Sequence, residues 1–131
     1  MMKINKFILY FVVTMTILFT SALANASPNY NKDHVRYGLA SYYSDKFHGR
    51  KTANGETFNM YKLTAASNRY KFGTKLRVTC AQTNKSVIVR VNDTGAFTRK
   101  YGREIDLSYA AAKALNMLDR GIIKVKIEEI K

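Results

Sequence analysis

The first 26 residues limit what the rest of this chain can fold into, because they read as a segment that is removed before folding. Lys3 and Lys6 give a short basic start, the apolar run FILYFVVTMTILF follows, and small residues close the segment in SALANAS. This order is typical of a secretory signal peptide. The apolar run is shorter than the roughly 20 residues that span a bilayer. We expect cleavage after Ala26, and the alternative is a retained membrane anchor.

Cleavage at that point leaves about 105 of the 131 residues, which is enough for one small domain. We predict a signal peptide over residues 1–26, a flexible polar leader over 27–36 and a single domain over 37–131. No cysteine directly follows the apolar run, so the sequence does not predict a lipoprotein. The mature protein is expected to be a periplasmic or secreted monomer, with no stable membrane insertion after cleavage.

The charge of the chain predicts the kind of partner. Its formal net charge is +13, and removing a segment with two lysines and no acid leaves 13 − 2 = +11. Such a surface suits a polyanion. Nucleic acid would satisfy the charge equally well, but a secretory segment favours a cell-wall polymer outside the cytoplasm. We therefore expect no nucleic-acid partner.

Cysteine and histidine usage argues against a disulfide, a metal or another cofactor. Cys80 is the only cysteine, so an intramolecular disulfide is impossible. It lies in the alternating run LRVTC, where a buried inert thiol is favoured over a nucleophile. His34 and His48 are far apart and no cysteine cluster accompanies them, so we expect no metal site and no cofactor.

Short runs rich in Val, Ile, Thr and Tyr, separated by turn formers, predict β-strands. These runs are GLASYYS (38–44), YKLTAAS (61–67), TKLRVTC (74–80), SVIVRVND (86–93) and IIKVKIEEI (122–130). TKLRVTC alternates polar and apolar residues, and SVIVRV reads as a central strand buried on both faces. One helix is predicted from Ser108, as N-cap, to Met117, with Gly121 stopping it. Many short strands with one late helix favour a small closed or nearly closed barrel.

Several spaced motifs resemble the rare lipoprotein A family. They are GLASYYSDKFHGRKTANGETFNMYKLTAAS, KFGTKLRV, SVIVRVNDTGAF and REIDLSYAAAKAL, and the resemblance runs from about residue 38 to residue 127. It implies a mainly β fold, a six-stranded double-psi β-barrel with one or two short helices, related to expansins and barwin-like proteins. It also implies a lytic transglycosylase that cuts peptidoglycan glycan strands, preferably strands stripped of their peptides.

Two features depart from the family pattern. Active members usually read TAAH where this chain has TAAS, so Ser67 occupies the histidine position, and a hydroxyl cannot replace an imidazole near neutral pH. The sporulation-related repeat domain that often follows the barrel is also not found in this sequence. The barrel alone is therefore expected to find the substrate.

Three acidic residues are the catalytic candidates. Cleaving a glycosidic bond requires a proton for the leaving oxygen, and carboxyl groups usually supply it. Asp106 stands between Ile105 and Leu107, an apolar setting that favours a protonated carboxyl, although it could instead only cap the following helix. Asp93 precedes Thr-Gly and could be a simple turn former. Glu56 would read as a hairpin residue, but the resemblance implies a part in activity.

A second set of residues is expected to contact substrate. Tyr43 could stack on a sugar ring, and the loop with His48 and Arg50 could meet the glycan, although His48 could equally be structural. The resemblance implies that Asn92 and Ser67 also belong to the site. The predicted substrate-binding residues are therefore Ser67, His48, Arg50, Tyr43 and Asn92.

Three hypotheses follow for the function. The leading one is an endolytic lytic transglycosylase that cleaves between N-acetylmuramic acid and N-acetylglucosamine and leaves a 1,6-anhydro end. The second is a glycan-binding or wall-loosening module, similar to expansins, that holds peptidoglycan without cutting it. The third is a structural partner of the division machinery that binds protein through its basic face.

Overall fold

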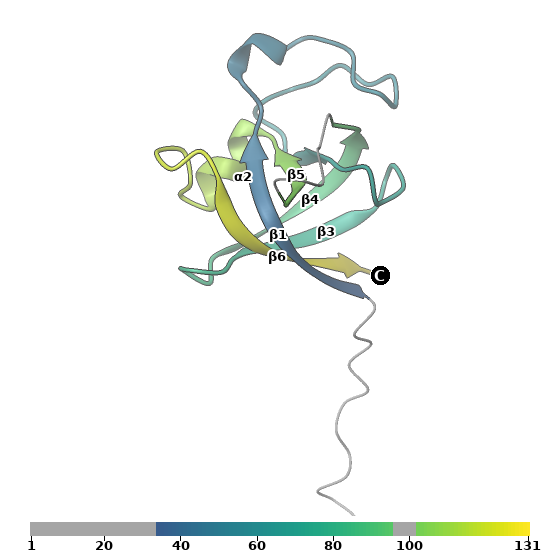
Figure 1. The fold of residues 1–131 in the computed structure, drawn as a ribbon. Helices are drawn as coiled ribbons and strands as arrows, with labels where there is room; N and C mark the ends of the chain where they lie inside the picture. Colours follow the sequence, from purple (N-terminus) through teal and green to yellow (C-terminus); the bar gives the residue numbers. More distant parts are fainter. Residues whose placement is uncertain (1–33, 96–101) are drawn as a thin grey trace, which may run out of the picture. The chain divides into compact units, whose positions relative to one another are not determined.

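Six strands close into a barrel in the computed structural model of the protein, which describes residues 34–95 and 102–131 (Figure 1). The strands are β1 (Val35–Tyr42), β2 (Thr64–Ala66), β3 (Lys75–Cys80), β4 (Ser86–Asp93), β5 (Arg103–Leu107) and β6 (Ile123–Ile130). The helical segments are the 3-10 turn η2 (Asp45–Phe47) and the helix α2 (Tyr109–Ala114). The predicted signal peptide and most of the predicted leader lie outside the described residues.

The barrel mixes parallel and antiparallel neighbours in the order β1-β5-β2-β4-β3-β6. β1 runs parallel to β5, and β2 runs parallel to β4, while the other four pairs are antiparallel. Parallel neighbours need long connections, so the barrel places segments side by side that are far apart in the sequence. The prediction of a mainly β, six-stranded closed barrel is confirmed.

The first strand begins earlier than predicted. Val35 and Arg36 were assigned to the leader, but they stand opposite Glu128 and Ile127 of β6. The polar composition of this stretch does not indicate a strand, because its partner, β6, lies far away in the sequence. The ordered domain therefore begins at least two residues before residue 37.

Alternation along the strands builds the core. In β3 the side chains of Leu76, Val78 and Cys80 are fully buried, as predicted, and Cys80 is a free cysteine. β4 was expected to be buried on both faces, which is wrong, because Ile88 is 46% exposed. Only Val87, Val89 and Val91 of that strand enter the core, since one face of a barrel strand always points outward.

The helix starts where the sequence predicts and ends sooner. The Ser108 hydroxyl accepts a hydrogen bond from the Ala111 N–H at 3.3 Å, which is the geometry of an N-cap. The predicted end at Met117 and the stop at Gly121 are wrong. α2 ends at Ala114, and Asn116 then adopts a left-handed conformation with φ of 53°. Asparagine tolerates that conformation better than most residues, so it ends the helix here.

The connection from β1 to β2 spans residues 43–63 and carries most of the predicted contact residues. It rises above one end of the barrel (Figure 1). The predicted strand over 61–67 is confined to Thr64–Ala66, whose three residues are all buried. Within the described part of the chain, no helix is long and apolar enough to cross a bilayer.

Candidate functional site

A row of four residues crosses four neighbouring strands and brings two aspartates to one face. Ser41 stands opposite Asp106, Asp106 opposite Ala66, and Ala66 opposite Asp93. Residues in register across a sheet point to the same face. Ile105, next to Asp106 in β5, is fully buried, so the row faces the outside of the barrel. One strand separates the two aspartates, which places their Cα atoms about 10 Å apart.

Asp106 is held by one firm hydrogen bond. Its Oδ1 accepts from the Ser41 hydroxyl at 2.6 Å, and its side chain is 18% exposed. Its Oδ2 lies 3.7 Å from the Arg103 guanidinium. Among the described residues, no hydrogen bond reaches this second oxygen. Ser41 therefore fixes the carboxyl group in place, and the second oxygen makes only the longer contact with Arg103.

Asp93 is held much more completely. Its Oδ1 accepts from the backbone N–H groups of Ala53, at 2.8 Å, and Thr94, at 2.9 Å. Its Oδ2 accepts from the Tyr43 hydroxyl at 2.7 Å. Three donors from two segments of the chain therefore fix the orientation of this carboxylate.

Tyr43 connects Asp93 to the aromatic part of the loop above. Its ring centroid lies 4.7 Å from that of Phe58 and 5.8 Å from that of Phe47. Burial raises the pKa of the Tyr43 hydroxyl above its ordinary value, and the hydrogen bond to Asp93 and the negative charges of Asp93 and Asp106 raise it further. Tyr43 therefore stays neutral and donates a hydrogen bond, and the charges of both aspartates affect its pKa.

Glu56 is bound on both oxygens. Arg90 donates to Oε1 at 2.6 Å and to Oε2 at 2.9 Å, and the side-chain amides of Asn54 and Asn92 add bonds of 2.9 and 3.1 Å. These donors, Arg90 first, lower the pKa of Glu56 from 4.5 to about 2. Glu56 is therefore a fixed anion near neutral pH and holds no proton to donate.

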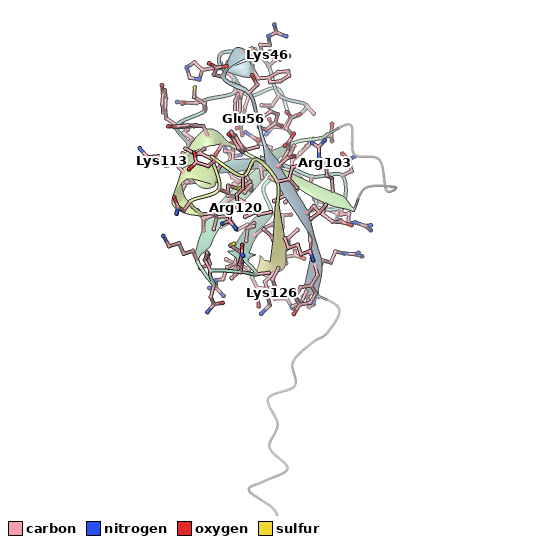
Figure 2. All side chains as sticks on the ribbon, turned by 60° about the vertical axis from the view of Figure 1, so that its left-hand side comes forward. Lys46, Glu56, Arg103, Lys113, Arg120 and Lys126 are labelled. Atoms are coloured by element: carbon pink, nitrogen blue, oxygen red, sulfur yellow. The ribbon has the colours of Figure 1, made fainter. Side chains whose placement is uncertain are left out.

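The Glu56 contacts tie a small hairpin to β4. A β-bridge between Lys51 and Thr57 closes this hairpin, and it carries the Ala53 N–H that binds Asp93. Glu56 lies at the end of the barrel where the loop with Lys46 rises (Figure 2). The ion pair with Arg90 of β4 therefore positions a donor to Asp93, three residues further along the same strand.

Comparison with known proteins identifies the family to which this chain belongs. A family model described as "Lytic transglycolase" matches residues 35–127. The endolytic peptidoglycan transglycosylase RlpA of Haemophilus influenzae is 46% identical over 104 residues, which are 79% of this chain and 36% of that protein. RlpA of Pseudomonas aeruginosa strain UCBPP-PA14 is 50% identical over 93 residues, 71% of this chain and 27% of that protein. The chain belongs to the rare lipoprotein A family. It spans about a third of the first relative and about a quarter of the second.

Solved structures share the fold of this family at low sequence identity. The expansin of Clavibacter michiganensis matches with a TM-score of 0.59 and 23% identity, covering 74% of this chain and 50% of that one. Cerato-platanin 3 from M. perniciosa matches with a TM-score of 0.54 and 13% identity, covering 73% of this chain and 95% of that one. The expansin-like double-psi barrel that the sequence predicts is thereby confirmed.

Two further residues predicted for the site are buried next to this row, one in β4 and one directly after β2. Asn92 is 3% exposed and donates to Glu56, while its side-chain oxygen is buried without a partner among the described residues. Ser67, at the family's histidine position, is 1% exposed. Its hydroxyl accepts from the Arg69 N–H at 3.3 Å, and its own N–H donates to the Asp93 carbonyl at 3.0 Å. Ser67 therefore holds the backbone of Asp93, Asn92 holds Glu56, and the predicted contact of both residues with substrate stays a prediction.

His48 and Arg50 lie on the loop, away from the row of aspartates. The His48 Nδ1 accepts from the Met60 N–H at 3.1 Å, and its ring centroid is 5.6 Å from that of Tyr61. The Arg50 guanidinium lies over the Phe47 ring at 5.7 Å. Both side chains are exposed, and their contact with substrate also stays a prediction.

Sequence analysis did not assign Ser41 or Asn54 to the site, and it did not pair Arg90 with Glu56. A lone arginine in the apolar run SVIVRV was a usable signal, because such a residue needs an acidic partner. Ser41 gave no signal, since its contact with Asp106 depends on a parallel strand pair. Within residues 34–95 and 102–131, no cluster of three or more His, Cys, Asp or Glu side chains could hold a metal ion.

Proposed function

We propose that this chain cleaves peptidoglycan glycan strands between N-acetylmuramic acid and N-acetylglucosamine and leaves a 1,6-anhydro end. The observation that carries the proposal is the geometry of Asp106: Ser41 fixes its Oδ1 by a hydrogen bond of 2.6 Å, while among the described residues its Oδ2 has only an ion-pair contact with Arg103 at 3.7 Å. Relatives that share 46% and 50% of the aligned residues are named endolytic peptidoglycan transglycosylases. The chain would act outside the cytoplasm, where this polymer lies.

Asp106 is the proton carrier in this proposal. Its carboxyl donates a proton to the glycosidic oxygen as the bond from that oxygen to the anomeric carbon breaks. The resulting carboxylate then takes the proton of the sugar's own 6-hydroxyl while that oxygen bonds to the anomeric carbon. One carboxyl group thus serves first as acid and then as base, and no water-activating group is needed.

Asp93 and Tyr43 take a different part. Both oxygens of Asp93 already accept hydrogen bonds, from Tyr43, Ala53 and Thr94, so this carboxylate is less suited than Asp106 to carry a proton to substrate. Its negative charge lies one strand away from Asp106, where it can stabilise positive charge that develops on the sugar ring. Tyr43 and the hairpin hold that charge in position.

Glu56 acts as a positioning residue rather than as an acid. Its pKa of about 2 keeps it ionised, and its bonds to Arg90 and Asn92 hold the hairpin against β4. Loss of Glu56 would therefore weaken activity through the placement of Asp93.

A glycan-binding module that does not cut is the second candidate function. One observation favours it: the expansin of Clavibacter michiganensis, which shares this fold, has been solved in complex with cellohexaose, a bound glucan. Ser67 at the histidine position is consistent with this reading.

Mass analysis of the soluble products separates the two functions. The purified chain and its Asp106→Asn variant are incubated with peptide-stripped peptidoglycan, and sedimentation with the glycan is measured in parallel. Anhydro-ended fragments from the wild type but not from the variant would support the enzyme. Sedimentation of both proteins without release of fragments would replace it with the binding module.

A further inference from the structure

An open hollow of about 740 Å³ lies beside the site, on the side of α2 and of the loop before β6. The ends of β1 and α2 contribute Tyr42 and Tyr109 to its lining, and the loop from residue 43 to residue 63 contributes Tyr61. Ile122, just before β6, also lines it. Its volume falls within the range of small-molecule sites in proteins.

One exposed ring and one exposed aliphatic side chain line this hollow. Tyr61 is 68% exposed and Ile122 is 51% exposed, so apolar surface faces solvent there from two separate segments. The Tyr61 ring is held edge-on between Tyr109, at 6.3 Å, and His48, at 5.6 Å. His48 also fixes the backbone beside it by accepting from the Met60 N–H. A solvent-exposed ring that is held in this way presents a ready surface to a flat apolar ligand face.

The charged residue in the lining disfavours one class of ligand, those with a carboxylate. Asp45 is the one charged residue among the nine described residues that line it, although the chain has 22 basic residues and 9 acidic ones. A ligand with a carboxylate would be repelled there, because like charges at short range disfavour each other. An uncharged ligand with an apolar face and hydroxyl groups suits the tyrosine rings, the Ser44 hydroxyl and the Asp45 carboxylate.

Tyr43 joins the hollow to the row of aspartates. It lines the hollow, and its hydroxyl donates to Asp93. The two sites are therefore one side-chain length apart. We infer that the hollow is a subsite for an uncharged N-acetylglucosamine residue of the glycan strand, with the sugar face on Tyr61. This inference rests on the proposed function for its choice of polymer.

Methionine labelling offers a direct test of occupancy. Met60 lines the hollow, whereas Met117 is fully buried in the core and serves as an internal control. In the chain labelled with ¹³C-methyl methionine, the Met60 signal is assigned by its loss in Met60→Leu. Titration with a hexamer of N-acetylglucosamine should shift the Met60 signal saturably and leave the Met117 signal in place. A Met60 signal that does not move at saturating hexamer would overturn the inference.

Matched tyrosine variants test the role of the ring. Tyr61→Ala should weaken hexamer binding about tenfold, which is the loss expected for one stacked ring. Tyr37→Ala is the control, because Tyr37 is 72% exposed on β1 and does not line the hollow. Equal affinities of the two variants would contradict the subsite. Both replaced rings are exposed, and far-UV circular dichroism confirms that each variant is folded.

A charged sugar tests the choice of ligand and separates this inference from the proposed function. N-acetylmuramic acid should bind more weakly than N-acetylglucosamine, and Asp45→Asn should narrow that difference. If the two sugars differ in affinity by the same factor in the wild type and in Asp45→Asn, Asp45 does not repel the carboxylate. The assignment of the hollow to an uncharged sugar would then be wrong. Hexamer binding at Met60 without anhydro products from glycan would leave the subsite standing and defeat the cleavage proposal. Release of anhydro products together with wild-type hexamer affinity in Tyr61→Ala would support the cleavage proposal and overturn the subsite.

Discussion

Asp106 on β5 and Glu56 on the hairpin before β2 are held in opposite ways. Asp106 has one hydrogen bond, from Ser41 to Oδ1, and its Oδ2 makes only a longer ion-pair contact with Arg103 at 3.7 Å. Glu56 has hydrogen bonds on both oxygens from Arg90, Asn54 and Asn92. The comparison shows two arrangements: Asp106 has one short hydrogen bond and a loose ion pair, whereas both oxygens of Glu56 accept short hydrogen bonds. The first arrangement leaves a carboxyl group more room to exchange a proton with a bound sugar.

The largest effect is expected from Asp106→Asn. An amide cannot give or take a proton at this position, so kcat for release of glycan fragments should fall about 10²- to 10⁴-fold. The side chain is partly exposed and makes one firm hydrogen bond, so thermal stability should change little. Initial rates on peptide-stripped glycan check the first statement, and thermal denaturation checks the second. Asp119→Asn, which removes an exposed acid on the loop after α2, is the matched control.

Tyr43→Phe should have an intermediate effect. The ring stays packed on Phe58, but Asp93 loses the one donor to its Oδ2. A hydrogen bond to a charged group contributes about 1.5–3 kcal/mol, and part of this loss should appear as a roughly tenfold lower kcat. Steady-state kinetics measure the change. A rate equal to that of the wild type would show that the orientation of Asp93 does not matter to the reaction.

The smallest effect is expected from Glu56→Gln, and it should depend on pH. Folding lowers the pKa of Glu56 from 4.5 to about 2, so the ionised group stabilises the fold fully above pH 4.5. That contribution is lost as the pH falls through 4.5 toward 2. Because the Glu56 and Arg90 side chains are 39% and 38% exposed, we expect only about 1 kcal/mol.

Urea denaturation at several pH values measures that dependence. The free energy of unfolding of the wild type should exceed that of Glu56→Gln at pH 7, and the difference should shrink between pH 4.5 and 2. A difference that stays constant across this range would mean that the ion pair with Arg90 does not stabilise the fold.

Local patterns in the sequence were enough to predict the parts of the fold that depend on neighbouring residues. The alternation in β3, the bounds of β4 and the Ser108 cap follow from side-chain period and from the need of a helix to satisfy its first N–H groups. Contacts that depend on distant segments were not predictable. The start of β1 at Val35 is set by pairing with β6, which composition does not reveal.

The same division applies to the site. Asp106, Asp93 and Glu56 are predictable as candidates from the sequence, and the apolar neighbours of Asp106 suggest a protonated carboxyl, but the partners of the three side chains are not predictable. Their roles depend on partners 34 to 65 residues away, such as Ser41 for Asp106 and Arg90 for Glu56. The closed order of strands, with two parallel pairs, creates those contacts.

The most direct test of this account compares Asp106→Asn with Glu56→Gln in one buffer, measuring the rate of anhydro-product release and the free energy of unfolding for each. We expect Asp106→Asn to lose at least about a hundredfold in rate at unchanged stability. We expect Glu56→Gln to keep its rate within about tenfold while losing about 1 kcal/mol of stability. A folded Glu56→Gln variant as inactive as Asp106→Asn, or an Asp106→Asn variant that keeps the full rate, would contradict the account.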